Sequence, residues 1–230
     1  MAVNAYTHPD MLVEPEWLAV HHDDPGVRII DTGSKDAYNR AHIPGAVGYP
    51  GSQFLKDEAS FILGPDAFTE LMQMLGVNND TLIVAYDGSS GLFASRLWWA
   101  LQYYGHPHMK LLNGGWDAWV AEDRPISIAS TPPERGTFQA HVQEQWLAKL
   151  DYVKESIGHS ERVLLDVRSD DEWTGANPMG TNRGGHLPGA VHLEWNKTVE
   201  SRTKKFKPAV ELRAMFADAG VTPDKEVIAY

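Results

Sequence analysis

The strongest constraint on the fold is an internal repeat. Residues 75–86, LGVNNDTLIVAY, and residues 219–230, AGVTPDKEVIAY, follow one plan: a glycine, a polar turn, and a short apolar strand that closes on Ala-Tyr. Matching positions lie 144 residues apart, as do Gly76 and Gly220. A glycine directly after a helical segment ends the helix, because it adopts the left-handed backbone without strain. The chain therefore predicts two copies of one helix–turn–strand unit.

The duplication extends to earlier parts of each copy. VRIID at residues 27–31 matches RVLLD at residues 162–166, and both read as compact buried strands that end in an acid. HIPGAV at residues 42–47 matches HLPGAV at residues 186–191. The strands are 135 residues apart and the His-containing blocks 144, so the second copy has nine extra residues, which we place in the stretch 175–184.

Helices are predicted between the repeated strands. Apolar side chains recur at spacings of three and four in residues 65–75 and 208–219, the pattern of an amphipathic helix. Strands that alternate with helices at this spacing predict an α/β fold with mainly parallel sheets. Further elements are expected in order along the chain: a helix at 93–104, a strand at 109–112, a helix carrying Trp116 and Trp119, and a helix at 146–156.

We expect two α/β domains from this pattern. The first spans residues 1–125, a linker rich in turn residues spans 126–145, and the second spans 146–230. The second copy contains no counterpart of residues 87–125, so its last strand would lack the helix that covers the matching strand in the first copy. We therefore expect the second domain to be incomplete in this sequence and the chain to continue beyond Tyr230.

Composition excludes several classes of function. The net charge of −11 argues against general binding to nucleic acid or to an anionic membrane. The N-terminal residues lack the basic and apolar regions of a signal peptide, and no run approaches the ~18 apolar residues that span a bilayer. We expect a soluble, cytoplasmic protein. The pairs His21–His22 and His106–His108 have no third ligand at a suitable spacing, so we expect no metal site and no organic cofactor.

These residues together resemble the rhodanese family of sulfurtransferases in its tandem, two-domain form. The resemblance covers nearly the whole chain. It is carried by Asp31 with AHIPGAV, by DVR at 166–168 with GGHLPGAVHLEW, by the two strands that end in Ala-Tyr, and by LNGGWDAW at 112–119. The ending TPDKEVIAY looks most like the bacterial branch that contains the thiosulfate and 3-mercaptopyruvate sulfurtransferases.

The resemblance implies a mechanism. In the family the first domain is inert, and the second has a cysteine directly after the strand that corresponds to residues 227–230. That thiolate takes the outer sulfur of the donor, becomes a persulfide, and passes the sulfur to cyanide or to a thiol. A loop whose N–H groups converge at a helix N-terminus would stabilise the thiolate. Residues 1–230 contain no cysteine, so we expect the nucleophile immediately after Tyr230, and a chain that stopped there would be inactive.

The resemblance also suggests further site residues. Asp87 follows the first Ala-Tyr strand and stands where an active domain has its nucleophile, so we expect it to be a structural loop cap. Arg168 and Arg183 are candidates to bind the anionic donor, and Trp195 is a candidate to line the pocket. Arg168 has an alternative role as a salt-bridge partner of nearby acids. Glu172 stands where many family members have a second donor-binding arginine, and this weakens the expected anion site.

Histidines and strand-end acids that occur in both copies have a different expected role. His42 and His186, like Asp31 and Asp166, repeat in the inert copy as well as in the active one. We therefore expect them to be buried structural groups that hydrogen-bond the neighbouring loops.

Three functions remain open from the sequence. The first is a thiosulfate sulfurtransferase that acts through a cysteine persulfide, with 3-mercaptopyruvate as the alternative donor. The second is an inactive rhodanese module used for binding, and the third is one of the phosphatases that share this fold, although the duplicated domain argues against that class. The expected partners are a small anionic sulfur donor and a thiophilic acceptor, and the sequence gives no oligomeric state.

Overall fold

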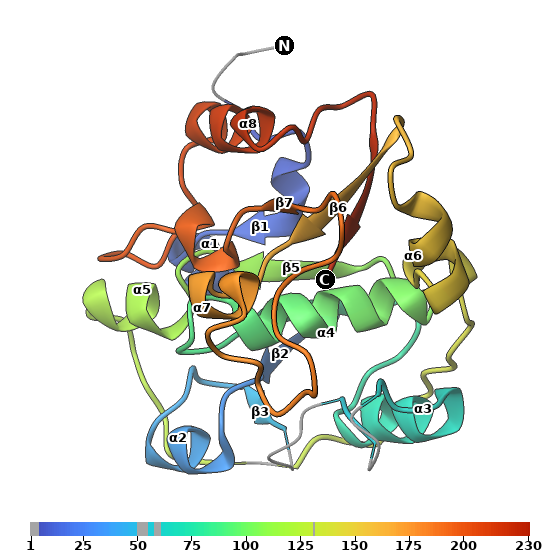
Figure 1. The fold of residues 1–230 in the computed structure, drawn as a ribbon. Coiled ribbons are helices and arrows are strands. Elements are labelled where there is room, and N and C mark those ends of the chain that lie inside the picture. The colour runs from blue at the N-terminus through green and yellow to red at the C-terminus, as the bar shows by residue number, and fades with distance from the viewer. Residues whose placement is uncertain (1–4, 50–54, 58–60, 131) are drawn as a thin grey trace. The chain divides into compact units, whose positions relative to one another are not determined.

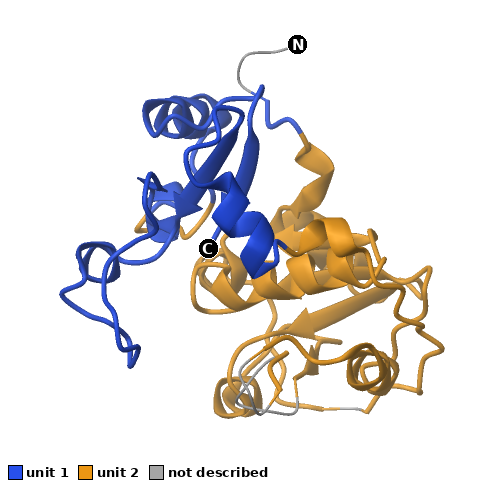
Figure 2. Ribbon diagram, turned by 45° about the vertical axis from the view of Figure 1, so that its right-hand side comes forward, with its two compact units in different colours: residues 1–7, 148–200, 206–230 blue, residues 8–147, 201–205 orange. Residues whose placement is uncertain are grey.

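The computed structural model describes residues 5–49, 55–57, 61–130 and 132–230. These residues fall into two compact units, coloured in Figure 2. Unit 2 contains residues 8–147 and 201–205, and unit 1 contains residues 1–7, 148–200 and 206–230. The first repeat thus lies in unit 2, together with the segment 126–145 that follows it and a short piece of the second repeat.

Unit 2 is built on a five-stranded parallel sheet of order β1-β5-β4-β2-β3 (Figure 1). Helix α4 packs on β4 and β5. The elements in chain order are η1 (Pro9–Met11), β1 (Leu12–Val13), α1 (Pro15–His21), β2 (Val27–Asp31), α2 (Lys35–Arg40), β3 (Val47–Gly48), α3 (Pro65–Met74), β4 (Leu82–Tyr86), α4 (Leu92–Tyr103), β5 (Met109–Leu112), α5 (Gly115–Ala121) and η2 (Glu144–Trp146).

Unit 1 contains a three-stranded parallel sheet of order β7-β6-β8. It repeats the neighbours β3-β2-β4 of unit 2, since β7, β6 and β8 match β3, β2 and β4 in sequence. Its elements in chain order are α6 (Leu150–Ser156), β6 (Arg162–Asp166), α7 (Asp170–Thr174), β7 (Val191–His192), η3 (Trp195–Thr198), α8 (Ala209–Asp218) and β8 (Glu226–Ala229).

The two units differ in how deeply their helices and strands are buried. Phe68, Leu71 and Met72 on α3 are buried, whereas Leu212, at the α8 position that matches Phe68, is only half-buried. Strand β4 is almost fully enclosed, but Ile228 is the single buried residue of β8. The predicted amphipathic helices are therefore present, with a complete apolar core beneath only the first.

One predicted boundary was inaccurate. The helix expected at 146–156 begins at Leu150, because residues 144–146 form the separate 3-10 turn η2 instead. The segment expected to be a linker, residues 126–145, lies in unit 2 together with the first repeat. It packs along unit 2, where Ser127 pairs with His42 and Phe138 is fully buried. No helix among the described residues is long and apolar enough to cross a membrane.

Candidate active site

Strands β4 and β8 reach the end of their sheets in the same way. The Thr32 amide donates to the Tyr86 carbonyl at 2.9 Å, and in the second repeat the Val167 amide donates to the Tyr230 carbonyl at 3.1 Å. The tyrosine hydroxyls are also equivalent. Each accepts an N–H from the repeated Pro-Gly block at 3.0 Å, from Ile43 in one repeat and from the matching leucine in the other. Residue 87 and the position after Tyr230 therefore follow equivalent strand ends.

The loop after β4 closes around the carboxylate of Asp87. One carboxylate oxygen accepts the amides of Ser89 at 2.7 Å and Gly91 at 2.9 Å. The other accepts the amides of Phe93 and Ala94, both at 2.9 Å. Asp87 is 1% exposed, so a buried negative charge is matched by four backbone donors at the first turn of α4. We refer to residues 87–94 as the amide cradle.

Close packing of α5 holds this loop in place. The amide of Trp116 donates to the Asp87 carbonyl at 2.9 Å. Gly115 lies beside it with φ of +53°, and a Cβ at Gly115 would come within 2.3 Å of the Asp87 carbonyl oxygen. Only glycine fits this approach, because any side chain would collide with backbone. The close approach of Gly115 thus positions the cradle.

The strand-end acids, Asp31 and Asp166, are in opposite electrostatic environments. Asp31 is buried, and no arginine or lysine among the described residues forms an ion pair with it. Burial raises its pKa, although Asp31 accepts the Gly33 amide at 2.8 Å. Asp166 is 0% exposed, and burial would raise its pKa in the same way. Hydrogen bonds from the guanidinium and the amide of Arg168 outweigh this effect and hold the pKa of Asp166 below the ordinary value. The matching position of Arg168 in the first repeat is Gly33.

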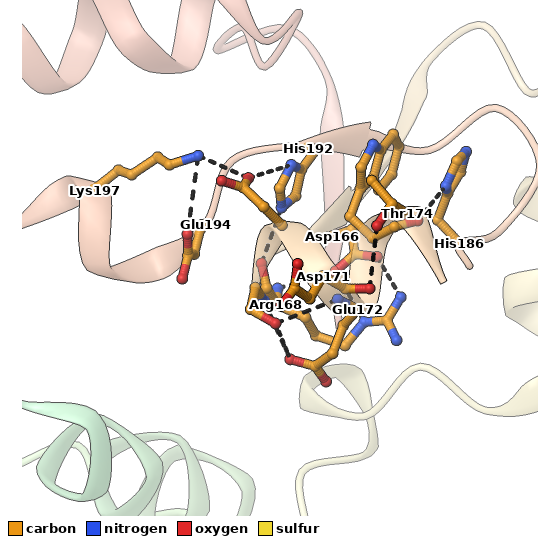
Figure 3. Close-up of polar contacts among 12 residues, drawn as sticks. Asp166, Arg168, Asp171, Glu172, Thr174, His186, His192, Glu194 and Lys197 are labelled. Atoms are coloured by element: carbon orange, nitrogen blue, oxygen red, sulfur yellow. Dashed lines mark hydrogen bonds and ion pairs between the residues drawn. The ribbon is translucent and has the colours of Figure 1, made fainter. Parts of the chain in front are cut away.

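Arg168 is fixed on three sides, as Figure 3 shows in part. Its Nε donates to Asp166 at 3.0 Å, and its Nη2 donates to the other oxygen of Asp166 at 2.5 Å and to the Gly185 carbonyl at 2.9 Å. The guanidinium carbon lies 5.3 Å from the ring centroid of Tyr230. Within the described residues no acceptor meets Nη1. The salt bridge that the sequence offered as an alternative is present, and one donor nitrogen is left over.

The other predicted residues are placed less closely. The amide of Trp195 donates to the Val167 carbonyl at 3.0 Å, which sets Trp195 beside the same strand end, with its side chain half-buried. Arg183 is exposed in the inserted loop. Among the described residues its side chain has no hydrogen-bond or ion-pair partner that would fix it near Arg168. Glu172 completes a capping box with Ser169 at the start of α7. Its carboxylate therefore has a structural partner.

A family model for the rhodanese-like domain matches two segments of the chain, residues 14–122 and 149–230. The chain belongs to the rhodanese family. The thiosulfate sulfurtransferase of Corynebacterium glutamicum is 33% identical in an alignment that covers 98% of this chain and 79% of the relative. The sulfur carrier protein TtuD of Thermus thermophilus is 33% identical in an alignment that covers 98% of this chain and 83% of the relative. The crystal structure of SseA from Escherichia coli, a 3-mercaptopyruvate sulfotransferase with a rhodanese fold, is 30% identical with a TM-score of 0.85, covering 95% and 87%.

These comparisons confirm the tandem rhodanese resemblance and the α/β class with two parallel sheets. The chain is homologous to the sulfurtransferases of this family. The two rhodanese repeats of this chain share the strand order and the pairing register of these strands. Asp31 pairs with Gly48 in the first repeat, and Asp166 pairs with His192 at the matching positions of the second. Among the described residues no three His, Asp or Glu side chains are arranged to hold a metal ion.

The prediction of a buried histidine is correct in one rhodanese repeat and wrong in the other. His42 is 0% exposed, and its ring nitrogens bond to the carbonyls of Tyr38 at 2.8 Å and Ala129 at 3.1 Å. His186 makes the equivalent first bond, to the Trp173 carbonyl at 2.9 Å, but its side chain is exposed. Ser127 pairs with His42 and the Ala129 carbonyl bonds its second ring nitrogen, whereas within the described residues the His186 ring has only the bond to Trp173.

Sequence reasoning missed an aromatic stack in the second repeat. Trp173 lies between two imidazoles, with ring centroids 3.5 Å from His186 and 4.9 Å from His192. His192 bonds the Arg168 carbonyl at 2.9 Å, so the stack adjoins the strand end (Figure 3). The only signal in the sequence was Trp173 standing where the first repeat has Tyr38, at the offset of 135 that relates the two strand-end acids.

Proposed function

We propose that this protein is a sulfurtransferase that moves sulfane sulfur from thiosulfate to cyanide or a thiol acceptor. The nucleophile would be a cysteine directly after Tyr230, held by a loop like the amide cradle. Residues 1–230 contain no cysteine, so these residues alone would position and support the reaction without carrying the sulfur.

The equivalence of the two strand ends carries this proposal. Tyr86 and Tyr230 have the same backbone bond and the same hydroxyl bond, so the residue after each starts from the same place in its repeat. At the first of these places a buried anion is stabilised by four N–H groups. A sulfur anion at the second place would gain the same stabilisation from an equivalent loop.

The reaction would proceed by two displacements. The thiolate attacks the outer sulfur of thiosulfate, the S–S bond of the donor breaks, and sulfite leaves with the electron pair. The resulting persulfide gives its terminal sulfur to cyanide, which becomes thiocyanate and regenerates the thiolate. No external oxidant or metal is needed for either step.

Arg168 is the best-supported donor-binding residue. Asp166 and Gly185 orient the guanidinium and leave Nη1 available, so it could donate to a sulfonate or carboxylate oxygen. Trp195 begins its 3-10 turn from the same strand end, where its ring could exclude water from the persulfide. Arg183 is a weaker candidate, because the exposed inserted loop does not fix its side chain.

Two alternatives come from the same site. A sulfur donor that carries a carboxylate, such as 3-mercaptopyruvate, could bind the same Arg168 nitrogen. The similarity to SseA supports this alternative donor. A rhodanese module used only for binding would follow if the residue after Tyr230 were not cysteine.

The deciding experiment is a sulfur-transfer assay on two proteins, the product of the complete gene and the 230-residue chain. With thiosulfate and cyanide, we expect the complete product to form thiocyanate and the 230-residue chain to form none. Replacing the cysteine after Tyr230 with serine should abolish the reaction. Activity with 3-mercaptopyruvate alone would select the alternative donor. A folded complete product that is inactive with both donors would overturn the enzyme proposal in favour of the binding module.

A further inference from the structure

The main chain of Arg168 is held at both of its polar groups (Figure 3). Its amide donates to the Asp166 carboxylate at 3.0 Å, and its carbonyl oxygen lies 2.9 Å from Nε2 of His192. A carbonyl oxygen can only accept, so the hydrogen of the second bond is on Nε2 of the imidazole. The guanidinium is held separately, by Asp166 and the Gly185 carbonyl. His192 therefore completes the set of bonds that fixes Arg168.

The imidazole of His192 is itself oriented by its neighbours. Its ring is nearly parallel to the Trp173 ring, with an interplanar angle of 4° and 4.9 Å between the ring centroids, and its side chain is 13% exposed. The other ring nitrogen, Nδ1, lies 3.6 Å from the Asp170 carboxylate, which accepts a hydrogen bond from Lys197 at 2.9 Å. That bond lowers the pKa of Asp170, so the carboxylate is charged at neutral pH. Stacking and a negative charge at Nδ1 thus leave Nε2 directed at the arginine carbonyl.

The first repeat lacks both residues and the space for the imidazole. Gly33 and Gly48 occupy the positions of Arg168 and His192 there. A Cβ at Gly48 would come within 2.7 Å of the Tyr38 ring, which occupies the place of the tryptophan. No side chain fits beside that ring unless the ring moves. The imidazole is therefore accommodated in the repeat that also has the arginine.

We propose that His192 is a positioning residue for the sulfur donor, which acts by holding Arg168 so that its Nη1 stays available to the donor. The inference rests on the proposed function, because it assigns His192 to the same donor site. The imidazole would not touch the donor. Its Nε2–H bond fixes the main chain of the arginine, so less freedom is lost when the guanidinium binds an anion. Loss of the bond should weaken capture of the donor and leave the later attack of cyanide unchanged.

Kinetics of the complete gene product test this role, because the two displacements can be measured separately. The ratio kcat/KM for thiosulfate reports the first displacement, and kcat/KM for cyanide reports the second. His192→Phe keeps a ring beside Trp173 but has no donor, so we expect kcat/KM for thiosulfate to fall about five- to tenfold. The ratio for cyanide should stay within about twofold of the unmodified value. His192→Gln, whose amide nitrogen can still donate to the Arg168 carbonyl, should recover most of the loss.

Two further variants separate positioning from a general structural effect. In an Arg168→Ala background, His192→Phe should cause no further loss, because the residue that it positions is absent. His186→Phe removes the other imidazole of the stack, which bonds the Trp173 carbonyl, and should leave both ratios within about twofold of the unmodified values. An unchanged kcat/KM for thiosulfate in His192→Phe, equal falls in both ratios, or an additive loss in the Arg168→Ala background would overturn the proposal.

Failure of the proposed function would be recognised separately, since the unmodified complete product would then transfer no sulfur from either donor. The same variants would in that case be compared by the dissociation constant for thiosulfate, measured by calorimetry, with the same fold-change expected for His192→Phe. A constant that His192→Phe does not change, or an unmodified product that does not bind thiosulfate, would overturn the positioning role as well.

A second measurement needs no substitution of His192 and so decides the case if His192→Phe does not fold. Proton–nitrogen correlation spectra of the imidazoles in the unmodified complete product report which ring nitrogen carries the hydrogen. In their neutral forms, His192 should carry it on Nε2 and His186 on Nδ1, because each of these nitrogens faces a carbonyl oxygen. His192 with its hydrogen on Nδ1 could not donate to the Arg168 carbonyl, and that result would overturn the proposal.

Discussion

At the scale of single residues, Arg168 accounts for the different strand ends of the two repeats. Its partner Asp166 is enclosed, and the ion pair holds the pKa of that carboxyl below the ordinary value despite burial. Such a group stabilises the fold above its unfolded-state pKa of about 3.9, and the stabilisation is lost as pH falls through the folded-state pKa. The first repeat has no matching ion pair at Asp31, because Gly33 stands in the place of the arginine.

We predict that Arg168→Ala lowers the free energy of unfolding by about 1–3 kcal/mol at pH 7. Removing one partner of a buried pair costs about 3–5 kcal/mol, and partial exposure of Arg168, 32% of its side chain, reduces that figure. The difference from the unmodified chain should be smaller at a pH below the unfolded-state pKa of about 3.9, because the stabilisation is lost as the pH falls toward and through the lowered folded-state pKa of Asp166. Urea denaturation at the two pH values measures both quantities.

Arg183→Ala is the matched control for this prediction. It removes the same charge from an exposed loop position, so it should change the free energy of unfolding by less than about 0.5 kcal/mol. Equal effects of the two substitutions, or an Arg168→Ala effect that does not depend on pH, would mean that the ion pair does not stabilise unit 1.

At the scale of elements, the approach of α5 to the loop after β4 is the tightest packing that supports the cradle. Gly115→Ala combines a left-handed backbone with a Cβ placed 2.3 Å from the Asp87 carbonyl oxygen. We predict a loss of about 2–5 kcal/mol in the free energy of unfolding, from backbone strain and overpacking together. Gly26→Ala, which meets nothing within 4 Å, should be neutral or slightly stabilising. A similar, small effect of both substitutions in thermal denaturation would contradict the packing argument.

The sequence could predict elements wherever the two copies could be compared. The strands at 27–31 and 162–166 were placed correctly, because a repeated apolar run that ends in an acid fixes both ends of the strand. The α/β class also followed from the repeat. The helix beginning at Leu150 was placed four residues too early, because Trp146 fits the apolar spacing but belongs to a 3-10 turn.

Features that depend on tertiary contacts could not be predicted. Both histidines begin the same Pro-Gly block, yet His42, which also bonds the Ala129 carbonyl, is buried and His186 is exposed. The four bonds to Asp87 depend on left-handed residues at Ser90 and Gly91, and the first of these has no signal in its residue type. The placement of Trp173 between two imidazoles is a contact of residues distant in the chain.

At the scale of the whole molecule, large buried side chains are distributed unevenly. Unit 2 holds bulky side chains that are less than 2% exposed, among them Trp119, Tyr86, Tyr104, Phe68 and Phe138. Unit 1 buries smaller side chains, among them Val163, Leu164, Leu165 and Ile228. Buried apolar area is the main source of stability, at about 25 cal/mol per Å², so unit 1 should have the lower local stability in this chain.

We therefore predict that amides of β6 exchange with deuterium faster than amides of β4. Both strands lie at the centre of parallel sheets and pair on both sides, so hydrogen bonding alone would protect them equally. A difference of at least about tenfold, corresponding to 1.4 kcal/mol in opening free energy, is expected after correction for intrinsic rates. Leu164→Ala, a core truncation in β6, should enlarge the difference, because unit 1 has few other apolar contacts to replace it. Equal protection of β4 and β6 would instead mean that the 230 residues open as one cooperative unit, and the uneven distribution of large side chains would then have no consequence for stability.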